Sequence, residues 1–307
     1  MDERSSEIAL IHKAQALNLK KEHRRQSFWV ALMWLFGLIT VSILILVVGY
    51  VLLKGGTAIN WEFLTTPPKG GLSGEGGIST TIGTTFYLVG LTLLIATPLG
   101  VGAAMFLIEY AGEQSLGSKF LRSMISIANF AVETLAGIPS IIYGLFGYAL
   151  FVSTLKFGFS LLSAALAGAC LVLPTIIRTT EEALLAVPDD YRRGSLALGA
   201  TKWQTLYRVV LPASTPGIIT GIILSVGRVI SETAIFYVTL GGSYRMPTSV
   251  MDSGRTLALH LYYLAMDTRA FDKAMGTGAV LVVMIILINL LIDFVSRKLT
   301  AGVRRVR

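Results

Sequence analysis

The stretch from Ala197 to Leu240 reads ALGATKWQTLYRVVLPASTPGIITGIILSVGRVISETAIFYVTL, and it decides the class of fold. From Ala213 onward it is an apolar run of 28 residues that contains one base, Arg228, and one acid, Glu232. A helix of that length, rising about 1.5 Å per residue, crosses the roughly 30 Å of bilayer hydrocarbon. A charge at that depth costs about 2.5–3.5 kcal/mol on insertion scales, so intramembrane charges are usually functional. The run predicts a transmembrane helix with a functional charged pair.

The composition of the whole chain indicates a membrane protein. Of its 307 residues 53% are hydrophobic and only 14% are charged, with a mean hydropathy of +0.69, whereas soluble proteins carry about 25% charged residues. The apolar runs are long enough to cross a bilayer. We therefore expect an all-α integral membrane protein with six transmembrane helices. They are predicted at about 28–53, 80–109, 124–152, 158–177, 213–240 and 274–296.

Basic residues set the expected orientation. One alternating set of segments carries 18 of the 26 Lys and Arg residues and the other set carries seven. The positive-inside rule then places both termini in the cytoplasm. The resulting organisation is a cytoplasmic segment 1–27, a first helix 28–53, an extracytoplasmic loop 54–79, a membrane domain 80–297 with a cytoplasmic loop 178–212 and an extracytoplasmic loop 241–273, and a basic cytoplasmic tail 298–307. For residues 1–27, a short helix on the membrane surface and a frayed tail both remain open.

Several classes of chemistry find no support in the sequence. The single cysteine, Cys170, allows no intrachain disulfide, and three scattered histidines do not suggest a metal site. The Gly-rich stretch at 74–77 lacks the lysine of a phosphate-binding loop, and neither H-E-x-x-H nor G-x-S-x-G occurs. We expect a chain that catalyses no reaction alone and needs no cofactor. The net charge of +8 fits basic cytoplasmic loops better than nucleic acid.

The 178–212 loop has the strongest local pattern. Pro188 ends any preceding helix, and Asp189 or Asp190 can cap a new one. Small residues follow, and then Trp203, Leu206 and Tyr207 at helical spacing. Small residues allow close approach to a partner and aromatic residues anchor it. A helix resting on the lipid interface would use the same aromatic residues, so both interpretations stay open.

The spacing of this loop resembles a known motif. Gly199, nine residues, and then Val209-x-Leu211-Pro212 are similar to the "EAA" loop of ABC importer permeases. Arg193 stands where that motif begins with Glu, so this sequence departs from the motif at its first position. The resemblance implies contact with an ATPase through Ala197, Leu198, Gly199, Ala200, Thr201, Lys202 and Trp203.

Three stretches resemble the A-type permease of phosphate ABC importers in particular. They are 137–147 (GIPSIIYGLFG), 197–205 (ALGATKWQT) and 227–234 (GRVISETA), where Ser231 replaces the usual Gly. The similarity covers about residues 60–297. It implies a MetI-like architecture in a bacterial inner membrane. The implied partners are a homologous C-type permease, a cytoplasmic ATPase dimer that uses ATP and Mg²⁺, and an extracytoplasmic phosphate-binding protein.

The intramembrane charges are candidates for the phosphate path. Arg228 and Glu232 lie one helical turn apart, and an Arg fork suits a tetrahedral oxyanion. A structural ion pair between subunits is the alternative. Glu133 either packs across a helix interface or balances Arg228. Rival functions are import of sulfate, molybdate or a phosphonate, secondary transport, and a regulatory scaffold.

Overall fold

The computed structural model describes residues 2–69, 74–110 and 119–304. The chain divides into two units, residues 1–53 and 54–307. The first unit is one helix, α1 (Asp2–Gly56), whose last residues belong to the second unit. Residues 1–27, for which a surface helix and a frayed tail were both open, are helical from Asp2 onward. From Arg25 to Gly56 the helix is long and apolar enough to span a membrane.

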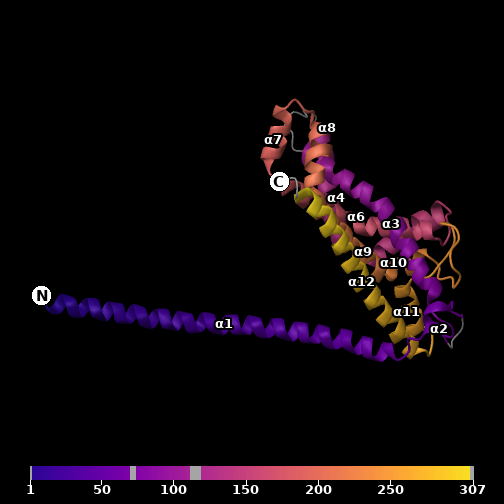
Figure 1. Cartoon of the computed structure of the whole chain (residues 1–307), viewed down its shortest axis with the longest axis horizontal. Coiled ribbons are helices and arrows are strands. Elements are labelled where there is room, and N and C mark those ends of the chain that lie inside the picture. Colours follow the sequence, from indigo (N-terminus) through magenta and orange to yellow (C-terminus); the bar gives the residue numbers. More distant parts are fainter. Residues whose placement is uncertain (1, 70–73, 111–118, 305–307) are drawn as a thin grey trace. The chain divides into compact units, whose positions relative to one another are not determined.

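The second unit is helical throughout its described regular elements (Figure 1). Its elements are α2 (Trp61–Thr65), α3 (Ser79–Met105), the π-helical η1 (Phe106–Tyr110), α4 (Lys119–Gly137), α5 (Ser140–Gly147), the π-helical η2 (Tyr148–Thr154), α6 (Leu161–Leu185), α7 (Asp189–Ala197), α8 (Lys202–Thr205), the π-helical η3 (Leu206–Val210), α9 (Leu211–Ser231), α10 (Ala234–Thr239), α11 (Leu257–Met266) and α12 (Phe271–Arg304).

Within the described residues, five helices are long and apolar enough to cross a membrane, and a sixth span is counted if one bent pair is a single crossing. This agrees with the six predicted spans. α3 with η1 covers the second, α6 runs eight residues beyond the expected end of the fourth, and α12 extends the sixth to Arg304. Residues 305–307 of the expected tail lie outside the described residues.

The third predicted span, 124–152, is not one helix. α4 and α5 meet at an angle of 112°. Pro139 precedes α5 and is the cause of the break, because a proline lacks the N–H of a continuing helix and disfavours helical backbone at the residue before it. The Tyr143 hydroxyl donates to the carbonyl oxygen of Leu135 at 2.6 Å and so satisfies one carbonyl at the end of α4.

The fifth span also differs from the prediction of 213–240. Its helix begins at Lys202, runs through α8, η3 and α9, and ends at Ser231. The backbone is extended at Glu232, with ψ of 131°, and a separate short helix, α10, follows. The first half of the quoted stretch is therefore a helix that leads directly into the membrane, and its second half contains a break.

α6 is the central helix of this unit, and small residues let its neighbours approach closely. A Cβ added to Gly217 of α9 would lie 2.5 Å from the Cβ of Ala183, and one added to Gly221 would overlap the Thr179 hydroxyl. On another face, Gly168 of α6 approaches the side chains of Thr92 and Phe236. Membrane helices associate through such packing because lipid tails are as apolar as the helices, so the hydrophobic effect does not bring the helices together. Gly217 and Gly221 thus form the close contact of α9 with α6, whereas Gly168 faces α3 and α10.

Candidate functional site

A tight corner joins α7 to α8, at the end of the second unit where Figure 1 places both labels. It contains all the residues expected to contact an ATPase: Ala197, Leu198, Gly199, Ala200, Thr201, Lys202 and Trp203. α7 begins at Asp189 with Pro188 as its N-cap, so Asp189 and Asp190 lie in the first turn instead of capping it. In the first turn, their negative charges interact favourably with the positive end of the helix dipole.

Gly199 ends α7. Its φ of +85° is left-handed, a conformation that glycine adopts without cost. The N–H of Gly199 donates to the carbonyl of Leu196 at 3.0 Å, and that of Ala200 donates to the carbonyl of Ser195 at 3.2 Å. This is a Schellman C-cap, which satisfies carbonyls that the helix leaves open. A Cβ at residue 199 would meet nothing within 4 Å, so steric crowding does not explain this glycine. Its left-handed backbone conformation does.

α8 starts at Lys202, three residues after Gly199, and its N-cap Thr201 forms a capping box. The Thr201 hydroxyl accepts from the N–H of Gln204, and the Gln204 side chain accepts from the N–H of Thr201. The Thr205 hydroxyl donates to the Ser195 hydroxyl oxygen at 2.9 Å and ties α8 back to α7. Two adjacent caps therefore fix the direction in which the chain turns.

The corner exposes apolar side chains. Leu198 is 91% exposed, Trp203 58% and Tyr207 60%, and the Trp203 and Tyr207 rings stack with centroids 6.2 Å apart. Leu206, on the same helix, points the other way and is 3% exposed in the core. We call Leu198, Trp203 and Tyr207 the corner surface. A surface of this kind, held on a rigid corner, suits a protein partner or the membrane interface.

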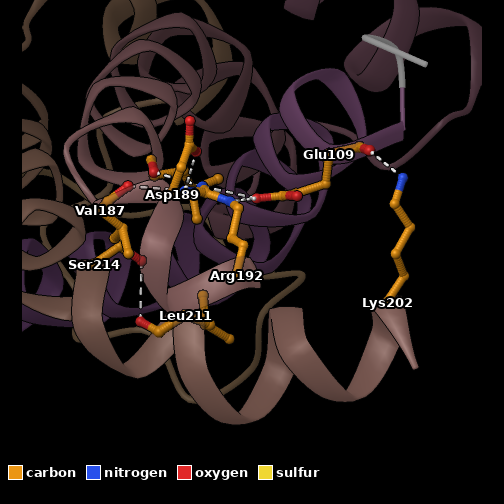
Figure 2. Close-up of polar contacts among 8 residues, drawn as sticks. Glu109, Val187, Asp189, Arg192, Lys202, Leu211 and Ser214 are labelled. Carbon is orange, nitrogen blue, oxygen red and sulfur yellow. Dashed lines mark hydrogen bonds and ion pairs between the residues drawn. The ribbon is translucent and has the colours of Figure 1, made fainter. Parts of the chain in front are cut away.

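Arg192 attaches this corner to the rest of the unit (Figure 2). Its guanidinium forms an ion pair with Glu109 at 2.9 Å. It also donates to the carbonyls of Leu184 at 2.9 Å and Val187 at 2.8 Å, at the end of α6. Lys202 adds a hydrogen bond from Nζ to the Glu109 carbonyl at 3.2 Å. Arg192 thus joins α7 to η1 and to the end of α6, and Lys202 joins α8 to η1.

A second candidate site lies where the two broken helices meet. A Cβ on Gly144 of α5 would lie 3.0 Å from the Cα of Ile235 and 3.3 Å from the carbonyl oxygen of Ala234 in α10, so the two backbones are in near contact. Arg228, about one turn before the break in its span, is exposed within the chain. Non-helical backbone at membrane depth occurs where it is buried in protein or lines a water-filled path.

Arg228 and Glu232 do not form the ion pair that their spacing suggested. Among the described residues no carboxylate lies within ion-pair distance of Arg228. The Glu232 carboxylate instead accepts from the N–H groups of Thr233 at 3.1 Å and Ile235 at 3.3 Å. It caps the start of α10, because the chain leaves the helix before residue 232 can lie above residue 228.

Glu133 does not balance Arg228 either. It forms an ion pair with Arg178 of α6 at 2.8 Å, and Arg178 also pairs with Glu181 at 2.9 Å. The contacts of α9 with α6 place Arg178 about level with residue 222 of α9, roughly 9 Å along the axis from Arg228 at 1.5 Å per residue. The predicted path residues therefore lie in two places.

Sequence reasoning missed three charged residues of these sites: Glu109, Arg178 and Arg192. The fourth predicted span ends at residue 177 and so leaves Arg178 in the following loop, whereas α6 continues to Leu185. The run Arg178-x-x-Glu181, at helical spacing, was the available signal. Nothing in the sequence links Arg192 to Glu109, which are 83 positions apart.

Comparison with known proteins gives these sites a context. The chain is 34% identical to the probable ABC transporter permease protein YqgI of Bacillus subtilis, over 87% of this chain and 96% of the relative. It is 33% identical to the phosphate transport system permease protein PstA of Mycobacterium leprae, over 91% of each. The PstA of Haemophilus influenzae is 32% identical over 76% of this chain and 80% of the relative.

Solved structures share the fold at lower identity. A chain of the MetNI methionine ABC transporter matches with a TM-score of 0.55 and 22% identity over 73% of this chain and 94% of that one. A chain of a bacterial alginate ABC transporter complex matches with a TM-score of 0.62 and 16% identity over 86% and 93%. These likenesses confirm the expected MetI-like architecture.

A family match covers most of the membrane region. Residues 125–305 match the family described as binding-protein-dependent transport system inner membrane component. The matched range includes the corner, both broken helices and Arg228. The chain belongs to this family and is a multi-pass membrane permease, a transport component of the binding-protein-dependent systems.

Proposed function

We propose that this permease is the A-type membrane subunit of an ATP-driven phosphate importer. The PstA relatives, at 32–34% identity over most of the chain, support phosphate as the substrate. In this proposal a homologous C-type permease completes the translocation path. A cytoplasmic ATPase dimer uses ATP and Mg²⁺, and an extracytoplasmic phosphate-binding protein delivers the anion. The chain itself catalyses no reaction.

The rigid corner between α7 and α8 is the observation that carries the coupling role. The corner surface exposes Leu198, Trp203 and Tyr207 beside two back-to-back helix caps. Arg192 and Lys202 join that corner to the end of α3. An ATPase that binds the corner surface can therefore move α3 and α9 as it closes, because no flexible linker intervenes. A helix lying on lipid would need no such attachment.

Arg228 is the proposed phosphate-binding group of the path. It is a charge on a span-forming helix, it is exposed within the chain, and no described carboxylate neutralises it. A guanidinium can donate two parallel hydrogen bonds to one oxyanion. The adjacent breaks at residues 138–139 and 232–233 supply unwound backbone of the kind that forms transporter sites near the bilayer midplane.

The proposed orientation places the corner and both termini in the cytoplasm. The support is the excess of basic residues, 18 against seven, in the segments on that side. The segment between α10 and α12 then faces the outside, where the binding protein delivers phosphate. The membrane is the bacterial inner membrane.

Uptake measurements test the substrate. Cells lacking the chain would be supplied with the unmodified gene, and uptake of ³²P-labelled phosphate would be measured at micromolar concentration. We expect uptake that depends on the chain and that excess sulfate, molybdate or a phosphonate does not compete away. Competition by one of those anions at lower concentration than phosphate would assign the importer to that anion instead. Co-purification of an ATPase with the tagged chain tests the coupling role, which a secondary transporter would not need.

A further inference from the structure

Arg255 is a buried charge that the proposed path does not use. It lies in the segment between α10 and α11 and is 7% exposed. Its Nε donates to the carbonyl oxygen of Gly242 at 3.0 Å. Its guanidinium carbon lies 4.2 Å from the centroid of the Tyr244 ring and 4.0 Å from that of the Tyr263 ring. The guanidinium plane is thus held between two aromatic rings.

No described carboxylate forms an ion pair with Arg255. Its Nη1 lies 3.4 Å from Nδ1 of His260. Burial of the imidazole, and then the charge of Arg255, lower the pKa of His260 to about 3. His260 is therefore neutral at physiological pH and supplies no countercharge. No described group accepts a hydrogen bond from Nη2, and burying an arginine without a compensating charge costs several kcal/mol.

A cavity of about 300 Å³ opens beside this arginine. Its walls include Lys69, Arg255, His260 and Tyr263. Three charged lining residues, Lys69, Glu75 and Asp267, are exposed to solvent, so their charges are screened at physiological salt and act more strongly at low salt. The charge buried at the cavity is therefore positive, and the volume accommodates an oxyanion with several waters.

The backbone around Arg255 is built to hold it. Gly241 and Gly242 have φ of +90° and +81°, and a Cβ on Gly242 would lie 3.1 Å from the Tyr263 hydroxyl. The N–H of Gly242 donates to the carbonyl of Gly254 at 2.9 Å. This double-glycine turn directs the Gly242 carbonyl toward Arg255. The site is preorganised, with Nε engaged and Nη2 left for a ligand.

From this arrangement we infer that the cavity at Arg255 is a second anion site, which receives a single oxyanion through the guanidinium and the Lys69 ammonium. The inference rests on the proposed function, in which the oxyanion is inorganic phosphate before it reaches Arg228. Tyr263 packs against Tyr237 of α10 with centroids 5.7 Å apart. α10 is the helix that Glu232 caps, so occupancy of the cavity is connected by direct packing to the break that follows Arg228.

Phosphate binding to the assembled importer tests this site. The importer would be prepared in lipid nanodiscs without binding protein, in the Arg228→Gln background to remove the other site, and titrated with inorganic phosphate by calorimetry at low salt. We expect binding that Arg255→Gln weakens at least tenfold and that Arg269→Gln leaves unchanged. Arg269 is a matched control, since it is an exposed arginine nearby that does not line the cavity.

A substitution at the exposed residue Asp267 tests the same site if the Arg255→Gln importer fails to assemble. Asp267→Asn removes a negative charge at the cavity and should tighten phosphate binding severalfold at low salt. Unchanged affinity in Asp267→Asn, or normal binding in an assembled Arg255→Gln importer, would overturn the inference.

A further result would assign the cavity to a different ligand. If Arg255→Gln weakens docking of the phosphate-free binding protein but not phosphate binding, the cavity receives a carboxylate of that protein, and the free-anion assignment is wrong. If the unmodified importer takes up phosphate but its phosphate binding does not depend on Arg255, this inference alone is wrong. If the unmodified importer takes up no phosphate, the proposed function is wrong.

Discussion

Arg192 and Glu109 form an ion pair of 2.9 Å across 83 positions of sequence, and this pair holds the corner between α7 and α8 against the end of α3. Both side chains are 17% exposed, so water competes only weakly for them. Glu109 lies in η1, a π-helical turn, and the corner helix α8 continues into another, η3. π-helical turns occur often at functional sites. The turns η1 and η3 therefore lie where the corner joins the membrane-spanning helices, so a displacement of the corner would be transmitted through them.

Arg192→Gln should destabilise the assembled importer more than Glu109→Gln. The first change removes the ion pair and the bonds to the carbonyls of Leu184 and Val187, at an expected cost of about 2–4 kcal/mol. The second leaves an amide oxygen as acceptor and should cost about 1 kcal/mol. Thermal unfolding and the ratio of ATP hydrolysed to phosphate imported would be measured. Arg193→Gln, an exposed neighbour, is the control, and an equal loss there would contradict the clamp.

Gly199→Ala and Gly194→Ala should have effects of opposite sign. Gly199 has φ of +85°, where a Cβ costs about 1–2 kcal/mol. Gly194 lies inside α7 with open space around it, where alanine is favoured by up to about 1 kcal/mol. Thermal stability of the purified chain measures both. Gly199→Asn should retain more uptake than Gly199→Ala because Asn tolerates this conformation, whereas equal losses would indicate that the partner requires glycine itself.

Gly221→Ala should weaken the contact between α9 and α6, and Gly227→Ala should not. The added Cβ at residue 221 would overlap the Thr179 side chain, whereas at residue 227 nothing lies within 4 Å. Overpacking of this kind typically costs about 1–3 kcal/mol. The midpoint of thermal unfolding in detergent would be compared for the two variants. Thr179→Ala should partly rescue Gly221→Ala, and no rescue would argue against the close approach.

Arg228→Gln should lower phosphate uptake at least about tenfold, since each charge-assisted hydrogen bond contributes roughly 1.5–3 kcal/mol. Arg228→Lys keeps the charge but loses the planar fork and should retain partial uptake. Glu232→Gln should assemble normally, because the amide oxygen can still cap α10, whereas Glu232→Ala loses the cap at about 1 kcal/mol. Near-normal uptake in the Arg228→Gln, Glu232→Gln double variant would sink the path role of Arg228.

Thiol labelling should confirm the orientation. In a Cys170→Ala background, Leu198→Cys places a thiol at a position that is 91% exposed on the corner, and Met251→Cys places one at a position that is 46% exposed near the opposite end. An impermeant reagent applied to intact cells should label residue 251 and not residue 198. Permeabilised cells, in which both should react, are the control, and the reverse pattern in intact cells would invert the topology.

The sequence by itself determined the membrane class and the number of spans. These follow from local quantities, namely the lengths and the composition of the apolar runs. Each depends on residues within a few positions of one another. For that reason they could be derived before any contact was known.

Only the tertiary structure decided which charges meet. Glu232 lies one turn after Arg228 in sequence, yet the helix ends at Ser231 and Glu232 caps α10 instead. Glu133 meets Arg178, and Arg192 meets Glu109, although nothing local joins either pair. Pairing of buried charges depends on which helix faces which and in what register, and small residues such as Gly221 set that register through packing. Helical periodicity therefore predicts which side chains are neighbours along one helix. It does not predict the partner of a charge where the helix breaks or where the partner lies on another helix.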